Sequence, residues 1–210
     1  MIHMRLGKSL SVSSCAVLML MALGCAQSTP NGSDYLLSAT RPGGPAPAGS
    51  KAILEVRRFS IDAEFANRGL VYRTGDFQFE GDAYREFLIA PAQMITQGTR
   101  DWLSRSGLFD QVLVPGSRFQ PTHTLEGNIL ALYGDLRDAA APAAVMELRC
   151  FLIADEDAAP RVLLARNYTS VKPLQADSAE GLVEALDACL VEILTNLERD
   201  LAQSVMEVSP

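Results

Sequence analysis

The sequence predicts an α+β fold: one antiparallel or mixed β-sheet with two long amphipathic helices packed on one of its faces. Three runs over residues 122–133, 145–154 and 161–171 are strand candidates, and their short connections predict antiparallel pairing. Two other runs, over residues 90–106 and 178–203, place apolar residues at helical spacing. Strands in succession beside helices with one apolar face are typical of a single α+β domain.

Shorter strands are predicted in the first half of the domain. Residues 52–61 alternate in polarity and predict a strand. Two β-prone runs, 70–74 and 77–80, flank Gly75-Asp76 and predict a hairpin. These elements precede the first helix, and the longer strands lie between the first helix and the last.

Each predicted helix has a marked apolar face. Pro91 suits the first turn of the first helix, and Met94, Gly98 and Trp102 fall on one line along it. Ser178 is a candidate N-cap for the second helix. The buried face of the second helix is predicted to consist of Leu182, Ala185, Leu186, Cys189, Leu190, Ile193, Leu194 and Leu197. We therefore expect both helices to pack against the sheet.

Residues 1–24 predict a secretory signal peptide. Arg5 and Lys8 form a basic start, an uncharged apolar stretch follows, and small residues end it. The apolar stretch is shorter than the roughly 20 residues that a membrane-spanning helix needs.

The residues before Cys25, Ala22-Leu23-Gly24, resemble the lipobox of bacterial lipoproteins. That resemblance implies that Cys25 receives a diacylglyceryl thioether, becomes the new N-terminus and is acylated again by a fatty acid such as palmitate. Two or more acyl chains anchor stably at about 0.8 kcal/mol per buried CH₂. The residue after Cys25 is Ala26, whereas an Asp at this position resembles an inner-membrane retention signal. Alanine therefore favours the periplasmic face of the outer membrane. The alternative is an ordinary signal peptide with an incidental cysteine near its cleavage site.

The chain after the signal peptide divides into a tether and a domain. Residues 25–50 predict the lipidated cysteine and a flexible tether, because 26–34 are small and polar and 41–50 are rich in Pro, Gly and Ala. Between these stretches, 35–37 is a candidate first strand. The folded domain is predicted over residues 51–205.

The charge of the chain argues against two ways of binding. The net charge of −7 becomes −9 when Arg5 and Lys8 leave with the signal peptide. A negative chain without clustered basic residues argues against nucleic-acid binding and against attachment to anionic lipids by charge. Membrane attachment therefore depends on the lipid at Cys25.

Two cysteines remain in the predicted domain. Cys150 lies on the inward face of a predicted strand, and Cys189 lies on the apolar stripe of the last helix. The two form either a disulfide, in an exported and oxidising compartment, or two free buried thiols.

The sequence offers no catalytic or metal site. His123 is the only histidine after the signal peptide, so a zinc site with two histidines is excluded and a Ser-His-Asp hydrolase is disfavoured. The chain contains no GxSxG, HExxH, GxGxxG or P-loop sequence. We therefore expect a protein without enzymatic activity and without a cofactor.

Three further residues have two interpretations each. Arg57 and Arg58 form either a small basic patch or strand-edge charges that block aggregation. Trp102 is either a partner-binding residue or, as its place in the helical apolar stripe favours, part of the core.

Several runs of the chain resemble the ABC-type transport auxiliary lipoprotein family, and together they extend over residues 35–203. In chain order the runs are 67–73 (NRGLVYR), the helix from Pro91 to Leu103, 106–112 (SGLFDQV), 125–127 (LEG), 145–152 and 163–166. Each run alone is weak, but their order and spacing after a lipobox are more specific.

The resemblance implies a role beside an ABC permease, its ATPase and an MCE-domain protein, in systems that move lipids or other apolar molecules across the cell envelope. The lipoprotein would anchor or cap the conduit at the outer membrane, and a homo-oligomer would fit this role. The alternative is an outer-membrane assembly lipoprotein that supports a β-barrel partner. A periplasmic enzyme and a soluble lipid carrier are further classes, but the sequence names no residue for either.

Overall fold

The structure is a computed structural model that describes residues 32–44, 49–155 and 159–206. The predicted signal peptide over 1–24 and the predicted lipidation site, Cys25, lie outside the described residues. Within them, the elements in chain order are β1 (Ser33–Tyr35), β2 (Ile53–Val56), β3 (Ser60–Ile61), the 3₁₀ turn η2 (Ala63–Phe65), β4 (Gly69–Arg73), β5 (Phe79–Phe87), α2 (Pro91–Ser104), β6 (Gln111–Val112), β7 (His123–Asp135), β8 (Ala143–Ala154), β9 (Arg161–Pro173) and α3 (Ala179–Met206).

The strands of the described chain form one mixed, nine-stranded sheet around the long strand β7. One edge of β7 pairs with β8 in antiparallel register, and β8 pairs with β9 in the same way. The other edge of β7 is shared by β2, β3 and β4, which all run parallel to it. β4 pairs with β5, and β5 pairs with β1 at the edge of the sheet. The predicted α+β fold with a mixed sheet is therefore confirmed.

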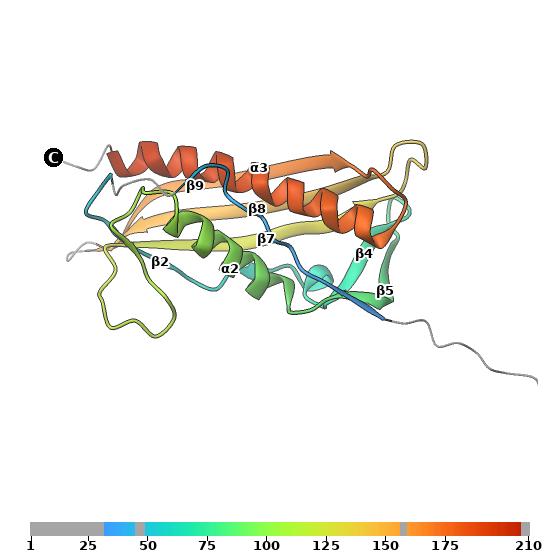
Figure 1. Ribbon diagram of the computed structural model, residues 1–210, viewed down its shortest axis with the longest axis horizontal. Helices are drawn as coiled ribbons and strands as arrows, with labels where there is room; N and C mark the ends of the chain where they lie inside the picture. Colours follow the sequence, from blue (N-terminus) through green and yellow to red (C-terminus); the bar gives the residue numbers. More distant parts are fainter. Residues whose placement is uncertain (1–31, 45–48, 156–158, 207–210) are drawn as a thin grey trace, which may run out of the picture. The chain divides into compact units, whose positions relative to one another are not determined.

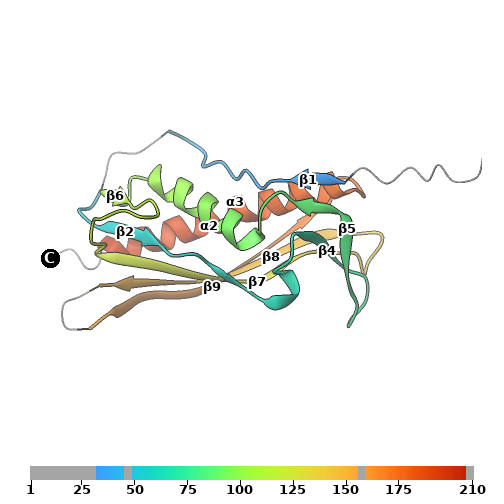
Figure 2. The ribbon, with the colours of Figure 1, turned by 90° about the horizontal axis from the view of Figure 1, so that it is seen from below.

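Both helices cover the same face of the sheet, as the sequence predicted (Figure 1, Figure 2). α3 lies along β8 and β9, and α2 lies beside it over β2. Strict alternation on β8 turns every second residue toward α3, and those side chains are buried. The core between sheet and α3 consists of Ala144, Met146, Leu148, Cys150, Leu152, Leu186, Cys189, Ile193 and Leu197.

The Phe59 ring, between β2 and β3, packs over Gly127 of β7. Phe59 is only 1% exposed. A Cβ added to Gly127 would meet the Phe59 ring at 2.7 Å, closer than real side chains approach. The absence of a side chain at Gly127 therefore makes room for the ring, and Gly127 lies in one of the runs that carry the family resemblance.

Part of the segment predicted as a flexible tether, residues 25–50, packs on the domain among the described residues. Residues 33–35 form β1 and pair with β5 in parallel register, two residues earlier than the strand predicted at 35–37. The backbone N–H of Leu88 donates to the carbonyl of Tyr35 at 2.9 Å. The folded unit therefore begins near residue 32 rather than at residue 51.

Cys150 and Cys189 are free and buried, so the disulfide considered from the sequence is not present. The Sγ atom of Cys189 lies 3.8 Å from the carbonyl oxygen of Ala144. Ala144 and Cys150 are six residues apart on β8, which is about 20 Å along a strand. A disulfide needs Cα atoms within about 7 Å, and the register of α3 over the sheet prevents this.

Candidate functional site: the N-terminal strap and its groove

Residues 33–41, which we call the strap, follow directly on the segment that contains the predicted lipidation site. The strap begins in β1 and then runs between α2 and α3 (Figure 1). It is the part of the domain that a lipid on Cys25 would pull on. Its contacts therefore decide how an anchor is joined to the folded body.

Three acidic residues along α3 hold the strap. Glu180, Asp187 and Glu198 are spaced by two and then three helical turns, so they lie in one row on α3. The hydrogen bonds run from Tyr35 Oη to Glu180 Oε1 at 2.7 Å, from Ser38 N to Asp187 Oδ1 at 2.6 Å, and from Arg41 Nε and Nη2 to Glu198 Oε2 and Oε1 at 2.9 Å each. The strap is thus fixed to α3 at three points along its length.

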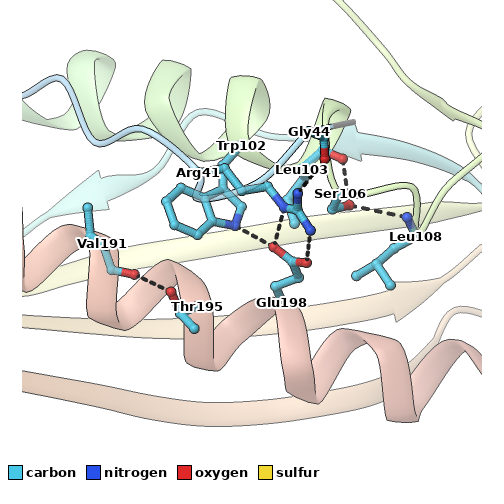
Figure 3. A network of polar contacts seen from close by, with 9 residues as sticks. All are labelled: Arg41, Gly44, Trp102, Leu103, Ser106, Leu108, Val191, Thr195 and Glu198. Carbon is cyan, nitrogen blue, oxygen red and sulfur yellow. Dashed lines mark hydrogen bonds and ion pairs between the residues drawn. The ribbon is translucent and has the colours of Figure 1, made fainter. Parts of the chain in front are cut away.

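The strongest of these points is the pairing of Arg41 with Glu198 (Figure 3). The guanidinium meets the carboxylate with two parallel hydrogen bonds, which is the stronger geometry for such a pair. The two side chains are only 15% and 20% exposed. Glu198 also accepts a hydrogen bond of 2.7 Å from Nε1 of Trp102. The hydrogen bond with Glu198 raises the pKa of Arg41, so the guanidinium stays charged.

The first point of attachment is more exposed. The hydrogen bond that Tyr35 donates to Glu180 raises the pKa of the phenol and lowers the pKa of the carboxyl group. Both shifts have the same cause, because the ionised carboxylate is the better acceptor and the neutral phenol is the donor.

A groove of about 410 Å³ lies between the strap and α2. Its apolar wall includes Leu36, Leu88, Ile89, Met94 and Leu190. Leu36 and Leu88 are each nearly half exposed, although both are leucines. The backbone N–H of Leu37 points to the sulfur of Met94 at 3.2 Å, which keeps the strap close to α2. The groove also has charged residues in its lining, namely Arg41, Asp101 and Arg105, and α2 and α3 form its floor.

The face of the sheet opposite the helices carries polar side chains at its middle. Arg149 Nε donates to Asn167 Oδ1 at 2.9 Å, and Asn167 Nδ2 donates to Glu147 Oε1 at 3.1 Å. Toward one end, Tyr133 and Val171 line a second hollow of about 510 Å³. Neither α2 nor α3 covers this face, and the Phe65 ring of η2 stacks on Tyr133 with ring centroids 5.9 Å apart.

The structure separates the two neighbouring arginines that the sequence singled out. Arg57 pairs with Glu126 at 2.7 Å and with Glu55 at 3.9 Å, so it belongs to a strand-edge ion cluster. Among the described residues Arg58 makes no ion pair, and it lines a different hollow together with Arg100. The two residues do not form one basic patch.

The single tryptophan and the tyrosine and arginine of the NRGLVYR run have structural roles. Trp102 is 2% exposed, which confirms the predicted core position. Tyr72 is partly buried in β4, and burial raises its pKa. Arg73 donates to the carbonyls of Gly75 and Asp76 and lies over the Phe79 ring at 5.4 Å, so it closes the β4–β5 turn.

His123 begins β7 and is buried. Its Nδ1 lies 2.8 Å from Thr122 Oγ1, and its Nε2 is enclosed without a hydrogen-bond partner. Burial lowers the pKa of His123. Over the described residues, no three His, Cys, Asp or Glu side chains gather into a group that could hold a metal ion.

Sequence reasoning missed the acidic row on α3. The signal was present, because Glu180, Asp187 and Glu198 share one line beside the apolar stripe of the predicted helix. Their partners lie in the segment predicted as a tether, and nothing local in that segment marks it as bound. In the described part of the chain, no helix is long and apolar enough to cross a membrane.

Comparison with solved structures shows the fold. Protein XCC0632 from Xanthomonas campestris matches with a TM-score of 0.73 at 16% identity, covering 83% of this chain and 98% of that one. An uncharacterized protein matches with a TM-score of 0.64 at 18% identity, covering 81% of this chain and 98% of that one. No curated protein matches the chain in sequence.

The sequence itself matches a family model over residues 35–198, which begins inside the strap and ends at Glu198. That model describes the ABC-type transport auxiliary lipoprotein component. The match covers most of the chain, and the family is the one that the sequence runs resemble. The chain belongs to the ABC-type transport auxiliary lipoprotein family.

Proposed function

We propose that this protein is a lipid-anchored periplasmic component of an ABC/MCE-type transporter that moves lipids or other apolar molecules across the cell envelope. Its proposed partners are an MCE-domain protein and the ABC permease with its ATPase. Its proposed location is the periplasmic face of the outer membrane, held by lipid on Cys25. In this role the protein binds and positions its partners and catalyses no reaction.

The observation that carries the proposal is the strap. Cys25 precedes the first described strand, which begins at Ser33, by eight residues. Eight residues span at most about 29 Å when fully extended. A lipid on Cys25 would therefore hold the domain within that distance of the membrane, and the bonds of the strap to α3 would transmit the attachment to the body.

Two surfaces are available to partners in this arrangement. The groove beside the strap has an apolar wall, which suits an apolar segment or chain. The face of the sheet opposite α2 and α3 has a polar middle, which suits a protein surface with matching hydrogen-bonding groups. Membrane attachment near the first surface and partner binding on the second are compatible with an auxiliary role.

The test is affinity purification of the tagged protein from detergent-solubilised envelopes, with mass spectrometry of the proteins that co-purify. We expect an MCE-domain protein or an ABC permease in the eluate. We also expect the Cys25→Ser variant, which cannot be lipidated, to leave the membrane fraction. A β-barrel assembly protein as the sole partner would instead support the alternative of an outer-membrane assembly lipoprotein. An unchanged membrane fraction for Cys25→Ser would overturn the anchor.

A further inference from the structure

A third hollow, of about 370 Å³, lies between α2 and the segment after β2, and Gln97 lines both this hollow and the groove beside the strap. Its lining consists of Arg58, Gln93, Thr96, Gln97, Arg100 and Pro115. Gln93, Gln97 and Arg100 are four and three residues apart, so one face of α2 presents all three. Arg58, in the segment after β2, completes the hollow from the opposite side.

The two arginines of this hollow have no acidic partner among the described residues. Seven other arginine or lysine side chains of the domain make ion pairs there, for example Arg41, Arg57 and Arg137. The chain has 25 acidic residues against 18 basic ones, so acids are plentiful. None of them lines this hollow. No described acidic residue therefore neutralises the positive charge there.

Arg100 has a second unusual feature. Its Nη2 donates to the carbonyl of Val56 at a long 3.3 Å. Its Nε is buried and has no hydrogen-bond acceptor. A buried charged donor without an acceptor costs free energy, and buried polar groups in native proteins are almost always paired. A bound molecule with an acceptor atom could accept a hydrogen bond from this N–H group.

The other polar groups of the hollow indicate which kind of ligand it can bind. The hydroxyl of Thr96 already accepts from the N–H of Phe59 and donates to the carbonyl of Ala92. It therefore offers no proton to a ligand. The amides of Gln93 and Gln97 can donate, so the hollow has cationic and neutral donors and no competing carboxylate.

We propose that this hollow binds a phosphate group. Guanidinium groups bind phosphate with paired hydrogen bonds, and phosphate carries enough charge to match two arginines. Donors reach the hollow from two sides, from α2 and from the segment after β2, which suits a tetrahedral group more than a planar carboxylate. The phosphate belongs either to a phospholipid headgroup or to a free phosphate ion. None of the residues that line this site belongs to the strap, and the proposal does not depend on the proposed transporter partners.

The test uses the full lipidated protein in micelles of an uncharged detergent. Thermal unfolding is followed by circular dichroism while sodium phosphate or a short-chain phosphatidylglycerol is added, with sodium chloride and sodium glutamate at equal ionic strength as references. Variants Arg58→Gln and Arg100→Gln remove one cation each. Arg199→Gln is the matched control, because Arg199 is an exposed arginine on α3 without an ion pair among the described residues.

We expect phosphate or the lipid to raise the melting temperature of the wild type and of Arg199→Gln. The apparent affinity should fall roughly tenfold or more in Arg58→Gln and Arg100→Gln, as expected when a charged hydrogen bond is lost. A response to inorganic phosphate would support the site and show that the phosphate group alone is enough. A response to the lipid alone would support it with the headgroup as the source.

Three results would overturn the proposal. They are no response to either phosphate compound, an equal response in the wild type and Arg58→Gln, or an equal response to glutamate. Should Arg100→Gln fail to fold, Arg58→Gln still decides the question, because Arg58 is exposed and its side chain makes no hydrogen bond or ion pair with the described residues.

Discussion

Nε1 of Trp102 donates a hydrogen bond of 2.7 Å to Oε2 of Glu198, which ties α2 to α3 through the same carboxylate that holds Arg41. The indole is buried, and the carboxylate lies at the edge of the core. One side chain of α3, Glu198, therefore binds both α2 and the strap.

Glu198→Gln should release the strap and lower stability. The carboxylate of Glu198 accepts two hydrogen bonds from Arg41 and one from Trp102. The amide of the variant keeps one oxygen acceptor and is uncharged, so we expect a loss of about 1–3 kcal/mol in the free energy of unfolding. Urea unfolding measures the loss, and limited proteolysis near residues 41–50 measures strap release. Glu184→Gln, at an exposed position of the same helix, is the control. Equal stability and equal cleavage of the two variants would contradict the role given to Glu198.

Gly127→Ala should destabilise the sheet, because its new Cβ would lie 2.7 Å from the buried Phe59 ring. Overpacking of this kind costs about 1–3 kcal/mol. Urea unfolding checks the value, and Gly81→Ala serves as the control, since nothing lies within 4 Å of a Cβ there. The double variant with Phe59→Leu should recover part of the loss. A Gly127→Ala protein as stable as Gly81→Ala would show that the ring can move freely.

The thiols of Cys150 and Cys189 should be unreactive in the folded protein. Burial raises the pKa of Cys150 to about 12 and also raises the pKa of Cys189, so little thiolate forms at neutral pH. A thiol reagent should react with both only after unfolding in denaturant without reductant. Detection of no thiol under those conditions would mean that the two are oxidised, against the arrangement in the structure.

Stability should fall as the pH decreases from about 7 toward 5, because of His123. Burial lowers the pKa of His123 in the folded state below its ordinary value of 6.5. The unfolded chain therefore binds the proton first, and acid favours unfolding until the pH passes the lowered folded-state pKa. His123→Gln should flatten the dependence of melting temperature on pH in this window. Identical slopes in the two proteins would exclude His123 as the cause.

Much of the fold was predicted from local patterns. The helix from Pro91 and the last helix follow from apolar spacing, and the structure places them at Pro91–Ser104 and Ala179–Met206. The three long strands follow from period-two alternation and short connections. These features are local because backbone geometry repeats every 3.6 or 2 residues, and a buried face must repeat with it.

Such local patterns could not predict most of the candidate site. Arg41 and Glu198 are 157 residues apart, and Tyr35 and Glu180 are 145 apart. A single hydrogen bond between distant segments leaves no periodic trace in either one. The strap therefore looked like a polar tether, and Arg58 looked like a neighbour of Arg57 rather than of Arg100.

The sequence by itself determined the α+β class, the two amphipathic helices, the lipobox-like segment before Cys25 and the resemblance to the transport auxiliary family. Only the tertiary structure decided the parallel pairing of β2, β3 and β4 along β7, the free state of Cys150 and Cys189, and the fixing of the strap to α3. The physical reason is that local patterns report which face of an element is buried. The partner that buries it is chosen by packing across the whole domain.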